Sequence, residues 1–269
     1  MVPAQVNSGS WSIPAHTIDE LAPKATKYCI VIPVINEGER IRKQLREMAD
    51  LELWKHADIL IADGGSKDGS LALDFLRDSH VRTLLTKTGP GKLSAQLRMA
   101  YGYALNEGYE GIVTIDGNDK DGVDAIPRFL NALDAGWDLV QGSRFVKGGE
   151  AVNTPWVRLL AIRIFHAPIL SIASRFKYTD TTNGFRGYSR RFLLDPGVQP
   201  FRECFSTYEL LPYLNVRAPR LGFKTEEIPV SRRYPMGEKA PTKISFLRGN
   251  WDLFRILFNA AFGRYNPKE

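Results

Sequence analysis

The chain of 269 residues is 43% apolar and 25% charged, enough to bury one substantial core but too short for two average domains. Lys and Arg number 36 against 30 Asp and Glu, and this basic balance favours phosphate-rich ligands, an anionic membrane surface or nucleic acid. The basic residues are scattered and lack interleaved aromatic stacking motifs, which argues against a nucleic-acid-binding protein.

The beginning of the chain predicts a loosely held leader over residues 1–26. It shows neither a basic segment followed by an apolar one nor a run of about 18 apolar residues, so we expect no export signal and no membrane-crossing helix there. Of the two cysteines, Cys29 lies in an apolar run, where a small buried side chain is more common than a disulfide. We therefore expect a cytoplasmic protein in a reducing compartment.

After the leader, apolar runs alternate with stretches of helical periodicity. The expected strands cover residues 28–34, 58–62, 111–115 and 138–141, and the expected helices cover residues 37–52, 69–79, 92–108 and 124–135. Such alternation is typical of a mostly parallel sheet with helices on both faces. We place this α/β domain at residues 27–240.

Two later segments combine apolar and basic residues. Residues 154–177 are rich in Trp, Leu, Ile and Phe, but their charges argue against a helix that spans a bilayer. In residues 241–269, apolar side chains recur at steps of three and four with basic residues at the border, which predicts a C-terminal amphipathic helix. Each segment is compatible with a helix that packs on the domain or with one that lies on a membrane surface.

Each expected strand ends in a polar or glycine-rich loop. In open α/β sheets, the loops at the carboxyl ends of the strands line one crevice, where ligands bind. The four loops contain Asn36-Glu37-Gly38, Asp63-Gly64-Gly65-Ser66, Asp116-Gly117-Asn118 and Gly142-Ser143-Arg144.

The residue types in these loops suit a nucleotide, a metal ion and phosphate. Asp63 can accept hydrogen bonds from a base or a ribose, although its loop is equally compatible with a tight turn. Asp116 offers a hard oxygen ligand for Mg²⁺ or Mn²⁺, and the alternative is an Asx-rich turn before the next helix. Arg144 and Arg186 suit bidentate phosphate contact, and both are candidates to face the crevice.

Other catalytic classes lack their usual motifs. The histidines show no zinc spacing, and neither a Ser-His-Asp nor a Cys-His order is visible. No glycine-rich loop of the Walker or dinucleotide type is present. These observations disfavour a hydrolase, a kinase or a dehydrogenase.

The order of the loop motifs resembles that of family 2 glycosyltransferases with the GT-A fold, a Rossmann-like, mostly parallel sheet flanked by helices. The resemblance rests on Val31-Ile32-Pro33 with Asn36-Glu37, Asp63-Gly64-Gly65-Ser66 with Asp68-Gly69, and Asp116-Gly117-Asn118. Later segments are similar to the branch of dolichyl-phosphate mannose synthases and polyprenyl-phosphate glycosyltransferases, and the likeness covers roughly residues 27–245. These segments are Gly142-Ser143-Arg144-Phe145-Val146-Lys147-Gly148-Gly149, Thr181-Thr182-Asn183-Gly184-Phe185-Arg186-Gly187-Tyr188, Leu221-Gly222-Phe223-Lys224 and Glu227-Ile228-Pro229-Val230.

The resemblance also implies a set of site residues. The nucleotide-sugar pocket would be lined by Pro33, Glu37, Asp63, Lys92, Asp116, Gly117 and Asn118. Asp116 and Asn118 would hold the metal ion, and Asp116 and Arg144 are the residues implied for catalysis. The acceptor phosphate would be faced by Arg144, Arg158 and one of Arg232 or Arg233.

Three positions depart from the family pattern. Asn118 replaces the usual second Asp, which removes one negative charge and should weaken metal binding. Lys120 stands where the family often places a neutral ligand, and a cation there can partly replace a metal or bind the diphosphate. Asp63-Gly64 stands where many members carry two acidic residues, so the nucleotide preference stays open.

The implied activity is inverting transfer of a hexose from a GDP- or UDP-sugar to a polyprenyl or dolichyl phosphate, at the cytoplasmic face of a membrane. A phosphate acceptor is already anionic and requires no general base. One alternative is a family 2 enzyme that acts on a glycan or small-molecule hydroxyl, with Glu209 as the best available base. Another is a non-catalytic module that binds a nucleotide-sugar.

Overall fold

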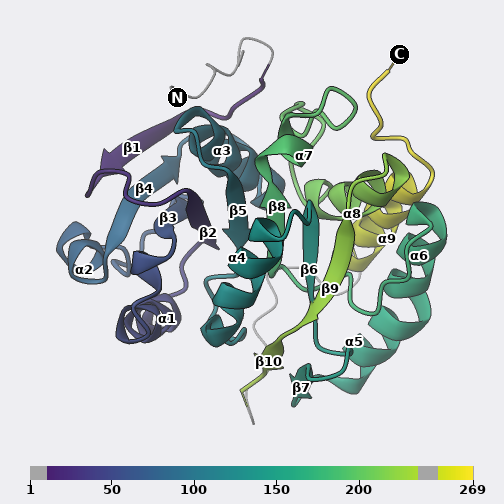
Figure 1. Ribbon diagram of the computed structural model, residues 1–269, viewed down its shortest axis with the longest axis horizontal. Coiled ribbons are helices and arrows are strands. Elements are labelled where there is room, and N and C mark those ends of the chain that lie inside the picture. The colour runs from purple at the N-terminus through teal and green to yellow at the C-terminus, as the bar shows by residue number, and fades with distance from the viewer. Residues whose placement is uncertain (1–10, 236–247, 269) are drawn as a thin grey trace.

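The computed structural model describes residues 11–235 and 248–268, and its centre is an eight-stranded sheet in the order β1-β4-β3-β2-β5-β8-β6-β9 (Figure 1). Strands β1 and β8 run antiparallel to their neighbours, and the other pairs are parallel. The strands are β1 (His16–Glu20), β2 (Tyr28–Val34), β3 (Asp58–Asp63), β4 (Val81–Lys87), β5 (Gly111–Thr114), β6 (Leu139–Ser143), β8 (Arg186–Ser189) and β9 (Thr225–Pro229). The expected α/β class and the mostly parallel sheet are confirmed.

Helices cover both faces of the sheet, and each face has its own apolar core. One core contains side chains of α1 (Glu39–Asp50), α2 (Leu73–Asp78) and α4 (Ile126–Asp134). The other contains side chains of α3 (Leu93–Asn106), α7 (Arg190–Leu194) and α8 (Leu210–Arg220). Strand β2 serves both cores, because Ile30 and Ile32 face one side while Cys29 and Val31 face the other, as the pleat requires.

The expectation of a loosely held leader is wrong from residue 11 onward. Strand β1 pairs with β4 along five residues, so this segment extends the sheet. Ahead of β1, the ring of Trp11 stacks on Phe201 with centroids 4.0 Å apart, and Arg98 donates a hydrogen bond to the Ser12 carbonyl. Tertiary contacts therefore hold a segment that lacks a strong strand pattern of its own.

Residues 154–177 contain one long helix made of α5 (Trp156–Leu160), a π-helical stretch (Ala161–His166) and α6 (Ala167–Ser174). Contrary to the expectation from its charges, this helix is long and apolar enough to cross a membrane by length and composition. It packs against α8 and against α9 (Arg248–Ala261), which confirms a C-terminal helix (Figure 1). Residues 241–247 of the expected C-terminal segment lie outside the described residues.

A small parallel sheet joins two distant parts of the chain. Strands β7 (Glu150–Val152) and β10 (Ser231–Arg233) pair in register, and Arg232 also bridges to Asp121. This arrangement brings residues 231–234 to the loop that follows β5. The late segment thus becomes part of the crevice at the carboxyl ends of the strands.

Candidate active site

The loops after β2 and β3 are bonded to each other. The Asn36 amide donates to Ser66 Oγ at 2.9 Å, and the Lys67 amide donates to Asn36 Oδ1 at 2.8 Å. The Gly38 amide donates to Asp68 Oδ2 at 2.8 Å. Asn36 takes a positive φ of 49°, a conformation that Asn tolerates better than most residues. The two predicted nucleotide loops therefore form one connected edge.

Asp63 lies at the tip of β3, where its carboxylate is buried and accepts hydrogen bonds from the Ser66 amide at 2.9 Å and from Ser66 Oγ at 2.6 Å. Gln96, which sequence reasoning missed, reaches from α3 to the same strand ends. Its amide donates to the Val34 carbonyl at 2.9 Å and to the Ala62 carbonyl at 3.0 Å. A Cβ at Gly64 would lie 2.9 Å from Gln96 Nε2, so a larger residue there would displace this side chain.

The remaining nucleotide-pocket candidates lie along this edge with different exposures. Pro33 is buried in β2, and its carbonyl accepts a hydrogen bond from the Gly117 amide. Glu37 accepts from Arg40 Nε at 3.0 Å and from Nη2 at 2.7 Å. Lys92 is exposed at the start of α3, with its ammonium 5.8 Å from the centre of the Tyr208 ring.

The loop after β5 contains the predicted metal ligands. Asp116 is partly exposed, and its Oδ2 accepts from Arg232 Nη2 at 3.2 Å. Its Oδ1 lies so close to Gly184 that a Cβ there would come within 2.3 Å. Asn118 Oδ1 is buried and has no hydrogen-bond partner among the described residues. Both are hard oxygen donors of the type that Mg²⁺ takes, and with only two of them a cation would complete its coordination with substrate phosphate.

Helix α1 holds the far end of this loop. Asp119 adopts a positive φ of 55° and donates its amide to the Oε1 atom of buried Gln44 at 3.0 Å. Lys43 pairs with the Asp119 carboxylate at 2.6 Å. The loop is therefore fixed on the side away from Asp116, which leaves Asp116 and Asn118 at the crevice. Within the described ranges, no three His, Cys, Asp or Glu side chains are grouped so that they could hold a metal without substrate.

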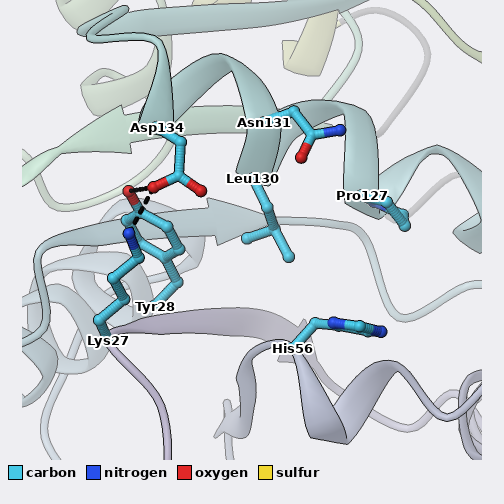
Figure 2. Close-up of a pocket in the computed structure, with 7 residues that line it drawn as sticks. All are labelled: Lys27, Tyr28, His56, Pro127, Leu130, Asn131 and Asp134. Atoms are coloured by element: carbon cyan, nitrogen blue, oxygen red, sulfur yellow. Dashed lines mark hydrogen bonds and ion pairs between the residues drawn. The ribbon is translucent and has the colours of Figure 1, made fainter.

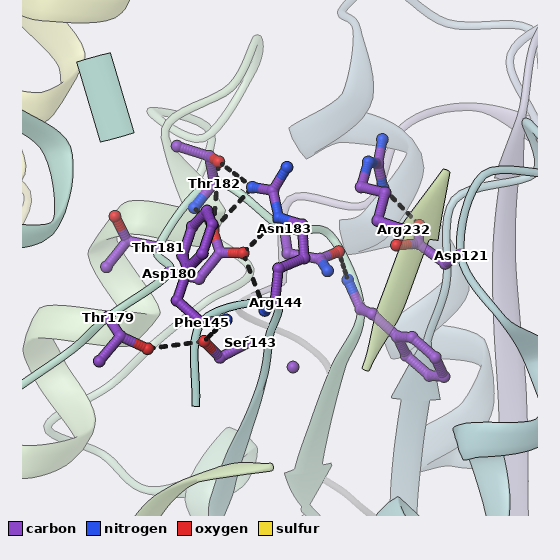
Figure 3. Close-up of polar contacts among 12 residues, drawn as sticks. Asp121, Ser143, Arg144, Phe145, Thr179, Asp180, Thr181, Thr182, Asn183 and Arg232 are labelled. Atoms are coloured by element: carbon purple, nitrogen blue, oxygen red, sulfur yellow. Dashed lines mark hydrogen bonds and ion pairs between the residues drawn. The ribbon is translucent and has the colours of Figure 1, made fainter. Parts of the chain in front are cut away.

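Basic side chains gather around Tyr234 beside Asp116. Arg232 is buried, and one of its terminal nitrogens pairs with Asp121 (Figure 3). Its other terminal nitrogen pairs with Asp116. Arg158 donates to Tyr234 Oη at 2.9 Å, and Lys120 Nζ lies 5.2 Å from the centre of the Tyr234 ring. Burial alone would raise the pKa of Tyr234, but the charges of Arg232 and Arg158 outweigh it and hold that pKa below its ordinary value.

Of the two arginines predicted as alternatives for the acceptor phosphate, Arg232 and Arg233, only one faces the crevice. Successive residues of a strand point to opposite sides, and in β10 it is Arg232 that faces the Asp116 loop. Arg233 is exposed and lies 3.9 Å from Glu150. Asp121, which sequence reasoning did not place in the site, is buried against Arg232 and has one oxygen without a hydrogen-bond partner among the described residues.

Arg144 has a partner that the sequence did not reveal. Its Nε and Nη2 atoms donate to the two oxygens of Asp180 at 2.6 and 2.9 Å, and both side chains are almost fully buried (Figure 3). Nη2 also donates to Thr182 Oγ1 at 3.0 Å, whereas Nη1 has no partner within the described chain. One guanidinium nitrogen of Arg144 is thus buried and, among the described residues, unpaired, while the rest of the side chain is fixed.

Arg186 does not face the crevice as expected. It is buried in β8 and donates to the carbonyls of Asn183 and Thr181 at 3.0 and 2.9 Å. These bonds brace the loop before β8, which carries Gly184. Arg186 therefore supports the loop beside Asp116 instead of offering a phosphate contact.

Glu209, the alternative base, lies in the loop before α8. Its carboxylate accepts from the Thr207 amide at 2.7 Å and from Thr207 Oγ1 at 2.5 Å. The amides of Lys92 and Ser94 donate to the carbonyls of Ser206 and Thr207, which ties this loop to the start of α3. Glu209 therefore lies near Lys92, on the nucleotide side of the crevice.

A pocket of about 240 Å³ lies elsewhere, at the amino end of β2 (Figure 2). Its lining contains an ion pair between Lys27 and Asp134, and Tyr28 donates to the same carboxylate at 2.8 Å. No predicted site residue lines it. The pocket is thus separate from the crevice at the carboxyl ends of the strands.

The sequence model of glycosyl transferase family 2 matches residues 29–195. The chain is 31% identical over 212 residues to the polyprenol monophosphomannose synthase of Mycolicibacterium smegmatis, covering 75% of this chain and 76% of that protein. It is 28% identical over 207 residues to the undecaprenyl-phosphate mannosyltransferase of Micrococcus luteus, covering 75% and 81%. Glucosyl-3-phosphoglycerate synthase from Mycobacterium tuberculosis, crystallised with UDP, shares the fold with a TM-score of 0.62 and 17% identity over 90% of this chain and 81% of that one.

Proposed function

Because the chain belongs to glycosyl transferase family 2, we propose that this glycosyltransferase moves a hexose from a nucleotide-sugar to a polyprenyl phosphate and inverts the anomeric carbon. One relative is named as a polyprenol monophosphomannose synthase and another as an undecaprenyl-phosphate mannosyltransferase, which supports a lipid phosphate as the acceptor. The observation that carries the proposal is the group of Arg144, Arg158 and Arg232 around Tyr234, next to Asp116.

The acceptor phosphate needs positioning more than activation. One of its anionic oxygens attacks the anomeric carbon while the bond from that carbon to the nucleoside diphosphate breaks, so a single displacement inverts the centre. No proton has to be removed from the acceptor. Arg158 and the free Nη1 atom of Arg144 would orient the phosphate and compensate its charge.

The donor would lie between the loops after β3 and β5. Asp63 and Glu37 would line the nucleoside part of the pocket with Pro33 and Lys92, and Asp116 and Asn118 would hold Mg²⁺ or Mn²⁺. Such a cation, when bound, neutralises charge that develops on the departing diphosphate. A related structure, of glucosyl-3-phosphoglycerate synthase, contains Mn²⁺ and UDP-glucose, which supports a divalent cation in this fold.

The two amphipathic segments support an acceptor at a membrane surface. Large apolar side chains are exposed on the helix 156–174, on α9 and directly after it, namely Trp156, Val157, Leu160, Ile164, Phe165, Ile172, Trp251, Phe258 and Phe262. The helices contact each other, and the Phe165 and Phe254 rings meet edge to face at 6.2 Å. Arg158 belongs to α5 and also contacts Tyr234, so this apolar surface adjoins the proposed phosphate site. We therefore place the protein peripherally on the cytoplasmic face of a membrane.

Membrane association can be tested with the paired substitution Ile172→Ser and Trp251→Ser. These side chains are 80% and 74% exposed, so their loss should spare the fold while removing contact with lipid. Co-sedimentation with vesicles that contain anionic phospholipid should drop several-fold. Leu51→Ser is the matched control, since Leu51 is 47% exposed at the end of α1, away from both helices. Equal sedimentation of the wild type, the paired variant and the control would show that the two helices have only a structural role.

A hydroxyl acceptor is the second candidate function, and the observation in its favour is Glu209. Its carboxylate is held by Thr207 near the start of α3, where a base for a sugar hydroxyl could be placed. The deciding experiment offers UDP- and GDP-sugars with Mg²⁺ or Mn²⁺ to a short polyprenyl phosphate or to glycan acceptors. A lipid-linked sugar is the expected product. Transfer only to glycans would establish the second function, and binding of a donor without transfer or hydrolysis would indicate a non-catalytic module.

A further inference from the structure

Lys120 is a cation in the donor loop that the proposed mechanism does not yet use. It follows Asn118 by two residues, is half-buried, and its carbonyl accepts a hydrogen bond from the Arg233 amide at 2.8 Å. Its ammonium packs 5.2 Å from the centre of the Tyr234 ring. Across residues 11–235 and 248–268 it forms no ion pair with a carboxylate. These contacts place a positive charge with no carboxylate partner among the described residues beside the predicted metal ligands.

The predicted metal ligand Asp116 is already paired with another cation. Arg232 reaches its Oδ2 at 3.2 Å and binds Asp121 with its other terminal nitrogen. In the crevice, three carboxylates face four basic side chains: Asp116, Asp121 and Asp180 against Lys120, Arg144, Arg158 and Arg232. The cluster thus carries a net positive charge before any donor or metal ion arrives.

Such a charge balance favours a diphosphate and disfavours a divalent cation. Two ionised carboxylates would offset the charge of Mg²⁺ or Mn²⁺, but Asp116 and neutral Asn118 supply only one negative charge, which is shared with Arg232. Positive side chains in a partly buried cleft attract an anionic ligand and repel a dication. The cluster itself therefore supplies part of the charge compensation that a metal ion gives to a leaving diphosphate.

We propose that Lys120 binds the diphosphate of the sugar donor and that, with Arg232, it makes donor binding only weakly dependent on a divalent cation. This inference rests on the proposed function, because it presumes a nucleotide-sugar in the crevice. It assigns Lys120 as a donor-binding residue and keeps Asp116 and Asn118 as ligands of a cation that adds little affinity.

The test measures binding of UDP and of GDP to the full chain by calorimetry, in EDTA and in Mn²⁺, for the wild type and for Lys120→Gln. The wild type should bind one nucleotide with affinities that differ by less than about fivefold between the two conditions. Loss of a charge-assisted contact should weaken binding by Lys120→Gln in EDTA by about 10- to 100-fold, and Mn²⁺ should restore most of it. Binding of Mn²⁺ in the presence of nucleotide can be followed by electron paramagnetic resonance. The affinity for Mn²⁺ should be higher in Lys120→Gln than in the wild type.

Lys43→Gln is the matched control. Lys43 lies on α1 and pairs with Asp119 at the other end of the same loop, so this variant removes the same charge away from the donor site. The ratio of its nucleotide affinity in Mn²⁺ to that in EDTA should equal the ratio of the wild type. If Lys120→Gln also keeps the wild-type ratio, or if the wild type binds nucleotide only with Mn²⁺, this inference is overturned while sugar transfer, assayed separately, still supports the proposed function. If neither nucleotide binds in either condition, the proposed function falls together with the inference.

Discussion

Asp180→Asn tests whether the buried ion pair with Arg144 organises the site. The two side chains are 0% and 1% exposed, and both carboxylate oxygens accept from the guanidinium at 2.6 and 2.9 Å. An amide can supply only one acceptor, so its NH₂ group would face a guanidinium N–H and the buried charge would lose its counterion. Breaking such a pair costs about 3–5 kcal/mol of unfolding free energy. Urea-induced unfolding followed by tryptophan fluorescence would measure this loss.

Two further variants separate charge from packing in that experiment. Asp124→Asn removes a partner from the solvent-exposed pair with Arg128 and should change stability by less than about 1 kcal/mol. The double substitution Arg144→Met with Asp180→Leu leaves no buried charge, so it should be more stable than Asp180→Asn alone. A change below about 1 kcal/mol for Asp180→Asn, or a double variant less stable than Asp180→Asn, would refute the reasoning from an uncompensated charge.

Two further predictions concern Asp116 and Tyr234. In Gly184→Ala the new Cβ would come within 2.3 Å of Asp116 Oδ1, so the Asp116 side chain must move. Sugar transfer should then fall by about 100-fold, with little change in the midpoint of urea-induced unfolding. Unchanged transfer would show that Asp116 does not position the reacting groups. Tyr234→Phe should remove the first tyrosine to ionise in an ultraviolet titration, because neighbouring arginines outweigh burial and hold the pKa of Tyr234 below 10.0. Between the lower pKa of folded Tyr234 and the ordinary pKa of 10.0 in the unfolded chain, the unfolded chain binds more protons. The contribution of Tyr234 to stability is therefore present above pH 10.0 and is lost as pH falls through the folded pKa. An ultraviolet titration of Tyr234→Phe identical to that of the wild type would contradict the lowered pKa.

Elements with strong local patterns were predictable from the sequence. The apolar run of β2 is buried on both faces, and its predicted bounds match the structure. Strand β4 was missed because it carries Arg82 and Thr83, and Arg82 is accommodated only by distant partners, Glu107 and Tyr109. Strand β8 was missed because its four residues include an arginine and a glycine, and pairing with β5 and β6 defines it.

The same contrast applies to the site. Asp63, Asp116 and Arg144 are predictable as crevice residues because each stands at the carboxyl end of a strand, and such positions converge in an open α/β sheet. Asp180 and Gln96 carry no such signal. Asp180 acts on a residue 36 positions away, and Gln96 reaches the Val34 carbonyl across 62 positions. Their roles depend on three-dimensional contacts that no local spacing encodes.

The two sides of the crevice differ in how they are built, and the difference bears on specificity. Asp63 and Asp116 lie within residues 29–195, the part of the chain that matches the family. Arg232 and Tyr234 lie beyond that part, and the pairing of β7 with β10 brings them to Asp116. A family that shares its donor chemistry and varies its acceptors should keep the donor loops within its common region. We therefore expect residues 225–235 and α9, which both lie outside residues 29–195, to influence which acceptor the enzyme uses more than the donor loops do.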